Sequence, residues 1–494
     1  MPVARPPLGE LSAPKRTAMN SSKAPRASWS SQLGFVFAAA ASAVGLGNIW
    51  RFPYLAAKYG GGIFLLCYLV LVVTLGFTMM TAEVAIGRRT GLAPFDAIRA
   101  IRRRWAWLGW LCTLVPAIIL PYYCIVGGWV LRYFTHYALA VFGLGGADPT
   151  AFVPADPSGA AGAAGYFSNF ISGSGPIAYG IAFTLACCAL ILLGVRRGIE
   201  KSNLVLMPML IALCFVVAGV SLAQPGAGAG LVYYLKPDFS KFSYKTVVTA
   251  MGQMFYSLSL AMGIMIAYGS YMRKEDSIER SVRRIEVFDT LVAVLAGLMV
   301  IPAVYAFADP ADPAHGMNGG AGLMFMNLPG VFRQMAGTNA VAALFFLLVL
   351  FAALTSCISI YETCVASLCD RTGWARRRAS LVTLVYALLL GLPSALGYGS
   401  GPLGGEIWHG MTFLDFSDFL ANNVLMPVAA FFIAVLVGWV VGPGWVAEEV
   451  RRGGAPFRAE KLFSAIVRWF APGLILVILV AYVLDGLGLA KFAS

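Results

Sequence analysis

The segment from Leu33 to Trp50 carries no charged residue and is close to the length that crosses the hydrocarbon core of a bilayer. Its middle, residues 42–48 (SAVGLGN), places two glycines and two polar side chains at the depth of the bilayer centre. Glycine costs a helix about 1 kcal/mol relative to alanine, so the helix is predicted to open here. Freed backbone groups survive at this depth only where protein encloses them or where they line a cavity. The segment therefore predicts a broken membrane helix whose backbone groups bind a ligand.

The composition places the rest of the chain in a membrane as well. Of its 494 residues, 59% are hydrophobic and 12% charged, whereas soluble domains carry about 25% charged residues. We therefore expect an all-α polytopic membrane protein with about eleven transmembrane helices. These helices are predicted at about residues 32–57, 62–87, 105–140, 176–195, 201–223, 246–272, 285–308, 338–369, 379–397, 412–442 and 461–487.

Basic residues orient these helices. With the N-terminus in the cytoplasm, most of the 36 Lys and Arg residues fall in cytoplasmic segments, as the positive-inside rule requires. The net charge of +13 is therefore explained by orientation in the plasma (inner) membrane, and no nucleic-acid partner is expected. Residues 1–28 are expected to be a cytoplasmic tail, 29–442 a core of ten helices, and 443–494 an eleventh helix with a short external C-terminus.

Other classes of protein find little support in the residue pattern. The three histidines, His136, His315 and His409, are far apart and lack the spacing of metal ligands. No nucleophile–base arrangement or catalytic metal motif is evident, so we expect no enzymatic activity. A channel is also disfavoured, because neither a ring-forming repeat nor a pore-loop motif occurs.

A second interrupted helix follows at residues 252–263 (GQMFYSLSLAMG), which groups Gln, Tyr and two Ser residues among small ones in mid-membrane. It belongs to the sixth predicted helix, so five helices separate the starts of the two broken segments. Interrupted segments at corresponding positions of two halves point to the binding site of a transporter.

Several motifs lie in order along the chain. They are Gly45–Pro53 (GLGNIWRFP), Gly60–Gly62 followed by Phe64 and Tyr68, Tyr122-Tyr123, Gln253–Gly263, Ala352–Ser356 (AALTS) and Asp415–Phe419 (DFSDF). Together they resemble the neurotransmitter:sodium symporters, in the bacterial branch that transports amino acids, from about Arg26 to the end of the tenth helix. The resemblance implies a five-plus-five inverted repeat, a leucine-transporter-like fold whose first and sixth helices are unwound at mid-membrane. It also implies import of an amino acid with Na⁺ by alternating access.

Two sodium sites are implied by the resemblance, built from oxygen ligands because Na⁺ is a hard cation. The first comprises the Ala43 carbonyl, the side chains of Asn48 and Ser257, and a residue of the seventh helix, for which the family frame gives Asp289. A register shifted by one residue would place Phe288 there, which cannot ligate through its side chain. Asp289 is alternatively an acid facing the surface, although acids within the membrane are functional by default.

The second implied sodium site takes its ligands from the first and the eighth helix. Its ligands are the carbonyls of Ala41, Val44 and Ala352 and the hydroxyls of Thr355 and Ser356. The alternative is that the two hydroxyls bond carbonyls of their own helix, one turn earlier.

Asp289 also bears on chloride. Animal relatives of the family bind chloride in a pocket that Tyr68, Gln253 and Ser257 would form here. A fixed carboxylate supplies the same negative charge beside Na⁺, so we expect transport that does not require chloride.

The substrate site follows from charge, because helix N-termini present partial positive charge and free N–H groups to an anion. The implied ligands of a carboxylate are the N–H groups of Leu46 and Gly47 and the Tyr123 hydroxyl. Those of an ammonium group are the carbonyls of Ala43 and Tyr256 and the Ser259 hydroxyl. Relatives that carry biogenic amines have Asp at the position of Gly45, so this chain requires a substrate with its own carboxylate.

The side-chain pocket carries no charge, which favours a neutral amino acid, hydrophobic or aromatic because Met262 adapts to large groups. Its implied residues are Ile119, Val126, Tyr256, Ser257, Met262, Ser356, Ser359 and Ile360. The alternative is that some of these residues only pack the core.

Gates are implied on both sides of the site. An ion pair between Arg51 and Asp418 would close the outer path above Tyr123 and Tyr256; exposed pairs contribute only about 0–1 kcal/mol, which suits a latch that opens. The inner gate would comprise Arg26, Trp29, Ser270, Tyr271 and Asp370. Arg and Trp are alternatively anchors at the membrane interface.

Two questions stay open at the level of the sequence. Glu83 and Glu362 are intramembrane acids with no role beyond buried hydrogen bonding or proton handling. A sensor or scaffold that keeps the fold without transporting remains the alternative function, and the oligomeric state is not determined.

Overall fold

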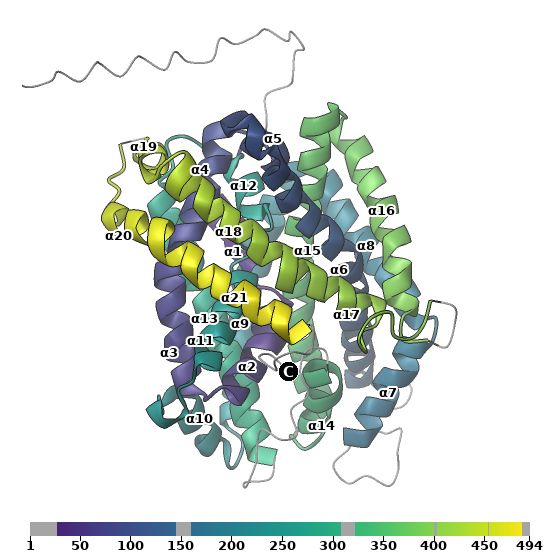
Figure 1. The fold of residues 1–494 in the computed structure, drawn as a ribbon. Helices are drawn as coiled ribbons and strands as arrows, with labels where there is room; N and C mark the ends of the chain where they lie inside the picture. The colour runs from purple at the N-terminus through teal and green to yellow at the C-terminus, as the bar shows by residue number, and fades with distance from the viewer. Residues whose placement is uncertain (1–26, 145–159, 308–321, 400–402, 453, 487–494) are drawn as a thin grey trace, which may run out of the picture.

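The computed structural model describes residues 27–144, 160–307, 322–399, 403–452 and 454–486. These residues form a bundle of helices, and the only extended pairings among them are the isolated bridges Gly61–Pro237 and Trp408–Met411. Figure 1 shows the helices crossing the molecule in both directions, with short helices capping the two ends. The expected tail, residues 1–28, lies almost entirely outside the described residues, as does Arg26 of the inner gate.

The first half of the bundle begins with an interrupted helix. Its elements are α1 (Gln32–Ala43), η1 (Gly47–Arg51), α2 (Phe52–Lys58), α3 (Gly62–Leu71), η2 (Val72–Gly76), α4 (Phe77–Thr90), α5 (Pro94–Ile101), η3 (Arg103–Trp105), α6 (Ala106–Val141), α7 (Ala160–Ser172), α8 (Gly175–Leu192), η4 (Val195–Glu200), α9 (Lys201–Leu222), α10 (Ala227–Leu235) and η5 (Phe239–Lys241).

The second half begins with another interruption. Its elements are α11 (Tyr244–Ser257), α12 (Ile264–Gly269), α13 (Ile278–Phe307), η6 (Leu323–Asn327), α14 (Leu328–Arg333), α15 (Thr338–Thr372), α16 (Arg376–Leu396), α17 (Phe413–Asp418), η7 (Phe419–Leu425), α18 (Met426–Val435), η8 (Leu436–Val440), α19 (Pro443–Arg451), α20 (Glu460–Ala465), η9 (Ile466–Phe470) and α21 (Ala471–Gly486).

The predicted membrane-spanning architecture is confirmed. Among the described residues, nine continuous helices are long and apolar enough to cross a membrane, and a tenth crossing is the pair 32–43 and 47–58, which bends by 52° at its break. The remaining crossing, the sixth predicted helix, corresponds to the interrupted pair α11 and α12. The chain is thus an all-α polytopic membrane protein in which the first and sixth helices are unwound.

The two breaks have different local causes. Val44 ends α1 in an extended conformation (ψ 94°), and the helix resumes after Gly45. The break between α11 and α12 contains three residues with positive φ, Ser259, Ala261 and Gly263. Because only glycine adopts such angles without a steric cost, neighbouring groups must stabilise the conformation of the other two residues.

Packing places both breaks at the centre of the bundle. α1 contacts α9, α13 and α15, while the long helices α6 and α15 pack along each other. Residues 41–49 of the first break and 257–269 of the second are all buried. The unwound backbone is therefore enclosed by protein, as membrane depth demands.

Several short helices were not predicted. α7 lies in the stretch 143–176, which was expected to be a loop rich in Gly and Ala, and α5, α10 and α19 connect longer helices. Each has 8–13 residues, which is too short for a hydropathy criterion based on spanning length.

Candidate functional site

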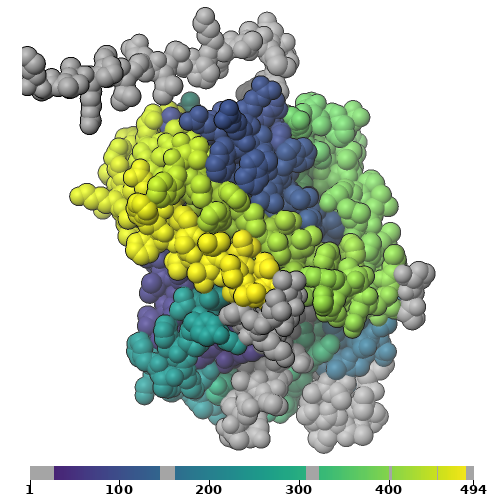
Figure 2. Space-filling view, in the orientation of Figure 1, coloured from purple at the N-terminus to yellow at the C-terminus, as the bar shows by residue number. Residues whose placement is uncertain are grey.

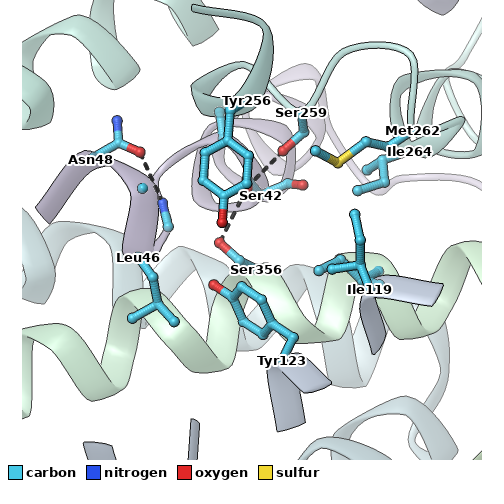
Figure 3. Close-up of a pocket in the computed structure, with 14 residues that line it drawn as sticks. Ser42, Leu46, Asn48, Ile119, Tyr123, Tyr256, Ser259, Met262, Ile264 and Ser356 are labelled. Carbon is cyan, nitrogen blue, oxygen red and sulfur yellow. Dashed lines mark hydrogen bonds between the residues drawn. The ribbon is translucent and has the colours of Figure 1, made fainter. Parts of the chain in front are cut away.

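A central cavity lies where the two breaks face the middle of α6 and α15 (Figure 3). The space between atoms at this place is about 370 Å³, including the part that is open to solvent. The lining residues are Ser42, Ala43, Gly45, Leu46, Gly47 and Asn48 from the first break, Ile119 and Tyr123 from α6, Tyr256, Ser259, Met262 and Ile264 from α11 to α12, and Ser356 and Ile360 from α15. None of these side chains carries a charge.

Most of the expected substrate residues line this cavity, but three do not. Val126 is buried on α6 outside the lining, and Ser257 belongs to a separate polar cluster described below. The Ser359 hydroxyl donates to the Thr355 carbonyl at 3.1 Å and accepts from the Tyr268 hydroxyl at 2.9 Å. Ser359 is thus occupied by contacts within the bundle.

Ser42 and Ile264 were missed in the sequence. The Ser42 carbonyl accepts hydrogen bonds from the hydroxyls of Ser259, at 3.0 Å, and Ser356, at 3.2 Å (Figure 3). Ser42 begins the segment 42–48 that predicted the first break. Its place in that segment was the only sequence feature that could have assigned it to the cavity. Ile264 opens α12, and its position depends on how the preceding loop turns.

Glycine is required at the first break by close approach of other side chains. A Cβ atom on Gly45 would lie 2.7 Å from Ser356 Oγ and 3.3 Å from the Tyr123 hydroxyl, and one on Gly47 would lie 2.1 Å from the Tyr256 ring. The Tyr123 hydroxyl is buried and has no hydrogen-bond partner among the described residues. A donor therefore points toward the free backbone of the break without being satisfied.

Carbonyls from the first break converge on α15. Ser356 Oγ lies within hydrogen-bond distance of the carbonyls of Ala41, Ser42 and Val44, at 3.4, 3.2 and 3.2 Å. Thr355 Oγ1 donates to the carbonyls of Phe351 and Ala352, at 2.9 and 3.1 Å. Two of the expected ligands of the second sodium site, the carbonyls of Ala41 and Val44, thus lie against the Ser356 hydroxyl. Both Thr355 bonds stay within its own helix, which was the alternative.

A buried carboxylate lies beside the first break. Asp289 is fully buried and accepts hydrogen bonds from Asn48 Nδ2 at 2.8 Å, Ser257 Oγ at 2.8 Å and the Tyr68 hydroxyl at 2.9 Å. Phe288 points elsewhere and packs on Phe37 with ring centroids 5.3 Å apart. The register that places Asp289 next to Asn48 is therefore the observed one, and neither alternative for the seventh helix holds.

The donors around Asp289 are all neutral. No Lys, Arg or His side chain of the described chain lies within 4.0 Å of its carboxylate. Asn48 Oδ1 accepts from the Gly45 N–H at 3.2 Å, and Gln253 Nε2 donates to the Gly47 carbonyl at 3.1 Å. A buried charge without a counter-charge is costly, so this cluster has the chemistry to hold a small cation.

The expected outer ion pair is absent from the described structure. The Arg51 guanidinium lies over the Tyr256 ring, 5.4 Å from its centroid. Asp418 instead accepts from the Tyr122 hydroxyl at 2.9 Å and from Asn422 Nδ2 at 2.7 Å. These two donors satisfy the carboxylate without Arg51, which corrects the prediction for this conformation.

Trp29, which was expected at an inner gate, packs against Tyr268 and Tyr271 after the second break. It is fully buried, its indole N–H donates to the Tyr268 carbonyl at 3.0 Å, and its backbone N–H to the Tyr271 carbonyl at 3.1 Å. A side chain without exposed surface is not an interfacial anchor. Ser270 bonds the Ala267 carbonyl, and Asp370 accepts from the Ala93 N–H at 2.7 Å.

Glu362 and Glu83, the two acids that had no assigned role, both accept hydrogen bonds from buried groups in this part of the bundle. Glu362 receives two bonds from Arg376, at 2.8 and 2.5 Å, and one from the Tyr271 hydroxyl at 2.8 Å. Glu83 Oε1 accepts the N–H of Ala261 at 2.6 Å, which stabilises the left-handed residue of the second break.

Glu200, which the sequence reading missed, accepts both the N–H and the hydroxyl of Ser30, at 3.0 and 2.5 Å. It ties η4 to the start of the first helix. No sequence motif marks this contact, because its partners are 170 residues apart.

Two discontinuous helices that enclose an uncharged cavity, flanked by a carbonyl cluster and a buried carboxylate, define a secondary transporter. The model of the sodium:neurotransmitter symporter family matches residues 26–141 and 165–489, and the chain belongs to this family. The protein is therefore a sodium-dependent symporter. The family consists of transporters, which is consistent with the expectation that the chain is not an enzyme.

Relatives and a solved structure agree with this assignment. The chain is 33% identical over 445 residues to the uncharacterised sodium-dependent transporter YhdH of Bacillus subtilis (strain 168), covering 90% of this chain and 93% of that protein. It is 31% identical over 482 residues to an uncharacterised sodium-dependent transporter of Haemophilus influenzae, covering 94% and 99%. The crystal structure of MhsT in complex with L-phenylalanine is similar with a TM-score of 0.80 and 33% identity, covering 92% of this chain and 100% of that one.

Proposed function

We propose that the protein imports a neutral, hydrophobic or aromatic amino acid together with Na⁺, by alternating access and without a requirement for chloride. The observation that carries the proposal is the uncharged central cavity at the two helix breaks, where Gly45 leaves no room for a side chain. Without an acid at this position, a substrate cation alone has no counter-charge. The substrate must bring its own carboxylate.

The polar end of the cavity suits an α-carboxylate and an α-ammonium group. The unpartnered Tyr123 hydroxyl and the N–H groups of Leu46 and Gly47 are donors for the carboxylate. Carbonyls of the first break, together with Tyr256 and Ser259, are acceptors for the ammonium. Each charge-assisted hydrogen bond contributes about 1.5–3 kcal/mol.

The other end of the cavity is apolar. Ile119, Met262, Ile264 and Ile360 form this wall, and the flexible thioether adapts to large side chains. The L-phenylalanine named with the similar structure supports an aromatic or large aliphatic substrate. The proposal therefore extends to phenylalanine, tryptophan, leucine and related amino acids.

Two sodium ions are part of the proposal. The first is coordinated by the Ala43 carbonyl, Asn48, Ser257 and Asp289, and the second by Ala41, Val44, Ala352, Thr355 and Ser356. The contact of Ser257 with Asp289, and those of Ser356 with the carbonyls of Ala41 and Val44, support these two groupings. At the first, the Asp289 carboxylate compensates the positive charge, so no chloride is needed.

Closure on the two sides completes the cycle. Trp29, Tyr271 and Asp370, with Arg26, close the inner path. Residues 29–442 form the transporter core and 443–494 the additional helix. The N-terminus lies in the cytoplasm and the C-terminus outside, in the plasma membrane, as the distribution of basic residues supports.

Uptake into proteoliposomes tests the proposal. Purified protein is reconstituted, a Na⁺ gradient is imposed in gluconate medium, and labelled amino acids are compared, with a K⁺ gradient as control. We expect uptake of large neutral amino acids only with Na⁺. Absence of uptake for every amino acid contradicts the proposal, and Na⁺-dependent binding without flux identifies the sensor alternative.

A further inference from the structure

A second set of cavities lies on the outside of the bundle, along α16. The most enclosed of these three cavities lies between α5, α6, α15 and α16 and has about 740 Å³ of space between atoms, including its open side. It shares Tyr386 with a cavity of about 570 Å³ beside α6 and α17, and Val382 with an open depression at the basic end of α16. Because they share lining residues, the three form one groove, which we call the α16 groove.

The interior of the α16 groove is mostly apolar, because most hydroxyl groups that line it already donate a hydrogen bond. The hydroxyls of Thr113 and Thr383 donate to carbonyls one turn earlier in their own helices, at 2.9 Å each. Ser367 does the same at 2.7 Å, and the Tyr386 hydroxyl donates to the Ala117 carbonyl at 2.8 Å. The Ser394 hydroxyl, beside α17, is buried without a partner among the described residues. The cavity between α5, α6, α15 and α16 has no such group, and it suits a hydrocarbon chain.

The groove opens on the surface that faces the lipid. Figure 2 shows the segment of α5 and the start of α6 (blue) beside the green surface of α15 and α16. Trp110, Val382 and Val385, which line the groove, are 56%, 41% and 54% exposed. Acyl chains of the bilayer have direct access to it.

Three arginines surround one end of the groove. Arg371 lines the enclosed cavity and lies 4.8 Å from the Phe95 ring centroid, while Arg377 and Arg378 line the open depression. None of the three is within 4.0 Å of a carboxylate in the described chain.

Three other arginines at this end of the bundle have acidic partners. Arg88 pairs with Glu449, Arg89 with Glu448, and Arg376, adjacent to the groove arginines, with Glu362. The groove thus combines a dry apolar interior with an uncompensated cluster of positive charge at its mouth.

We propose that the α16 groove binds an anionic phospholipid, with its headgroup at Arg371, Arg377 and Arg378 and an acyl chain inside the cavity. The dimensions agree with this occupant. Tyr386 lies ten residues along α16 from Arg376, which is about 15 Å at 1.5 Å per residue. Half of a hydrocarbon core about 30 Å thick is the same length, so the enclosed cavity spans one leaflet, which is the cytoplasmic one in the proposed orientation.

Charge complementarity selects this occupant over a second copy of the chain. If the α16 surface of a second copy occupied the groove, its three arginines would lie against the three of the first copy, and like charges in contact oppose association. An anionic headgroup is attracted instead. Basic residues near an anionic membrane surface each strengthen binding by about fivefold, and basic pockets between transmembrane helices are known to hold such headgroups.

Native mass spectrometry of the full-length protein in detergent tests the proposal, with phosphatidylglycerol and phosphatidylcholine of identical acyl chains as probes. We expect phosphatidylglycerol to bind the wild type at least tenfold more tightly. The triple variant Arg371→Gln, Arg377→Gln, Arg378→Gln should lose this preference. A matched triple variant with the same loss of charge elsewhere, Arg280→Gln, Arg284→Gln, Arg458→Gln, should retain it.

Val382→Trp tests the cavity separately, because an indole at this lipid-facing position fills the junction of the groove. It should reduce the affinity for phosphatidylglycerol about tenfold and leave the protein folded, as judged by its melting temperature. Equal binding of the two lipids, equal losses in the two triple variants, or full binding to Val382→Trp would each overturn the proposal. So would a dimer that Val382→Trp dissociates in the absence of lipid. The measurement uses neither Na⁺ nor an amino acid, so its outcome is independent of transport.

Discussion

Replacing Asp289 with asparagine removes a buried charge while preserving the shape of the side chain. In the wild type the carboxylate is fully buried and accepts bonds from Asn48, Ser257 and Tyr68 at 2.8–2.9 Å. An amide oxygen in the place of Oδ1 can still accept from Asn48 and Ser257, and the amide nitrogen in the place of Oδ2 can donate to the Tyr68 hydroxyl, so the fold should survive. The change isolates the charge beside the proposed first sodium ion.

The expected effect follows from Coulomb's law. A cation that the carboxylate coordinates lies within about 4 Å of the centre of its charge, where an effective dielectric constant of 20 gives an attraction of at least about 4 kcal/mol. Part of this is offset because the wild-type carboxylate is itself costly to bury. A loss of about 2–3 kcal/mol remains, so the Na⁺ concentration for half-maximal uptake should rise about 30- to 150-fold in chloride-free medium.

Chloride supplies the decisive comparison. Uptake by Asp289→Asn in proteoliposomes is measured as a function of Na⁺ in gluconate and in chloride medium. Chloride should partly restore the variant, because an anion near Tyr68, Gln253 and Ser257 replaces the missing charge, and should leave the wild type unchanged. Asp238→Asn is the matched control, since its carboxylate is exposed and bonds only Ser240. An Asp289→Asn protein with wild-type Na⁺ dependence in gluconate would refute the reasoning.

Three further predictions address the cavity and the second break. Gly45→Asp should abolish uptake of every amino acid, because its Cβ would lie 2.7 Å from Ser356 Oγ, and Gly45→Ala should reduce it less; wild-type uptake by Gly45→Asp would contradict the close approach. Tyr123→Phe should raise the KM for the amino acid by about 10- to 100-fold, because one charge-assisted hydrogen bond is lost, and should change kcat little. Tyr122→Phe is the control: the Tyr122 hydroxyl bonds Asp418, so its removal should leave the KM for the amino acid nearly unchanged. Glu83→Gln should keep the bond to the Ala261 N–H and cost little stability, while Glu83→Ala should lower the free energy of unfolding by about 1–3 kcal/mol, seen as a lower melting temperature in detergent; equal melting temperatures for the two variants would exclude this role.

The sequence alone determined the membrane class, the eleven crossings and the two breaks. Hydropathy suffices for the crossings because lipid forces each span to satisfy its own backbone. Glycines and clustered polar residues suffice to predict the breaks, because glycine destabilises a continuous helix and polar groups at membrane depth need to be enclosed or to line a cavity. The motif around Gly45 and Asn48 was enough to place the first break at the binding site, and hydropathy failed only for short connecting helices such as α7.

Only the tertiary structure decided which side chains meet. Each step along a helix of 3.6 residues per turn rotates the side-chain direction by about 100°. A register error of one residue therefore places Phe288 where Asp289 lies. The hydropathy of the whole segment does not distinguish the two registers. Contacts such as Glu83 with Ala261, or Glu200 with Ser30, join residues 178 and 170 positions apart. The expected outer gate shows that polar partners are not predictable from the sequence, because Asp418 accepts hydrogen bonds from Tyr122 and Asn422 and does not pair with Arg51. A local pattern records how each helix meets the lipid, whereas the polar partners inside the bundle depend on how all the helices pack together.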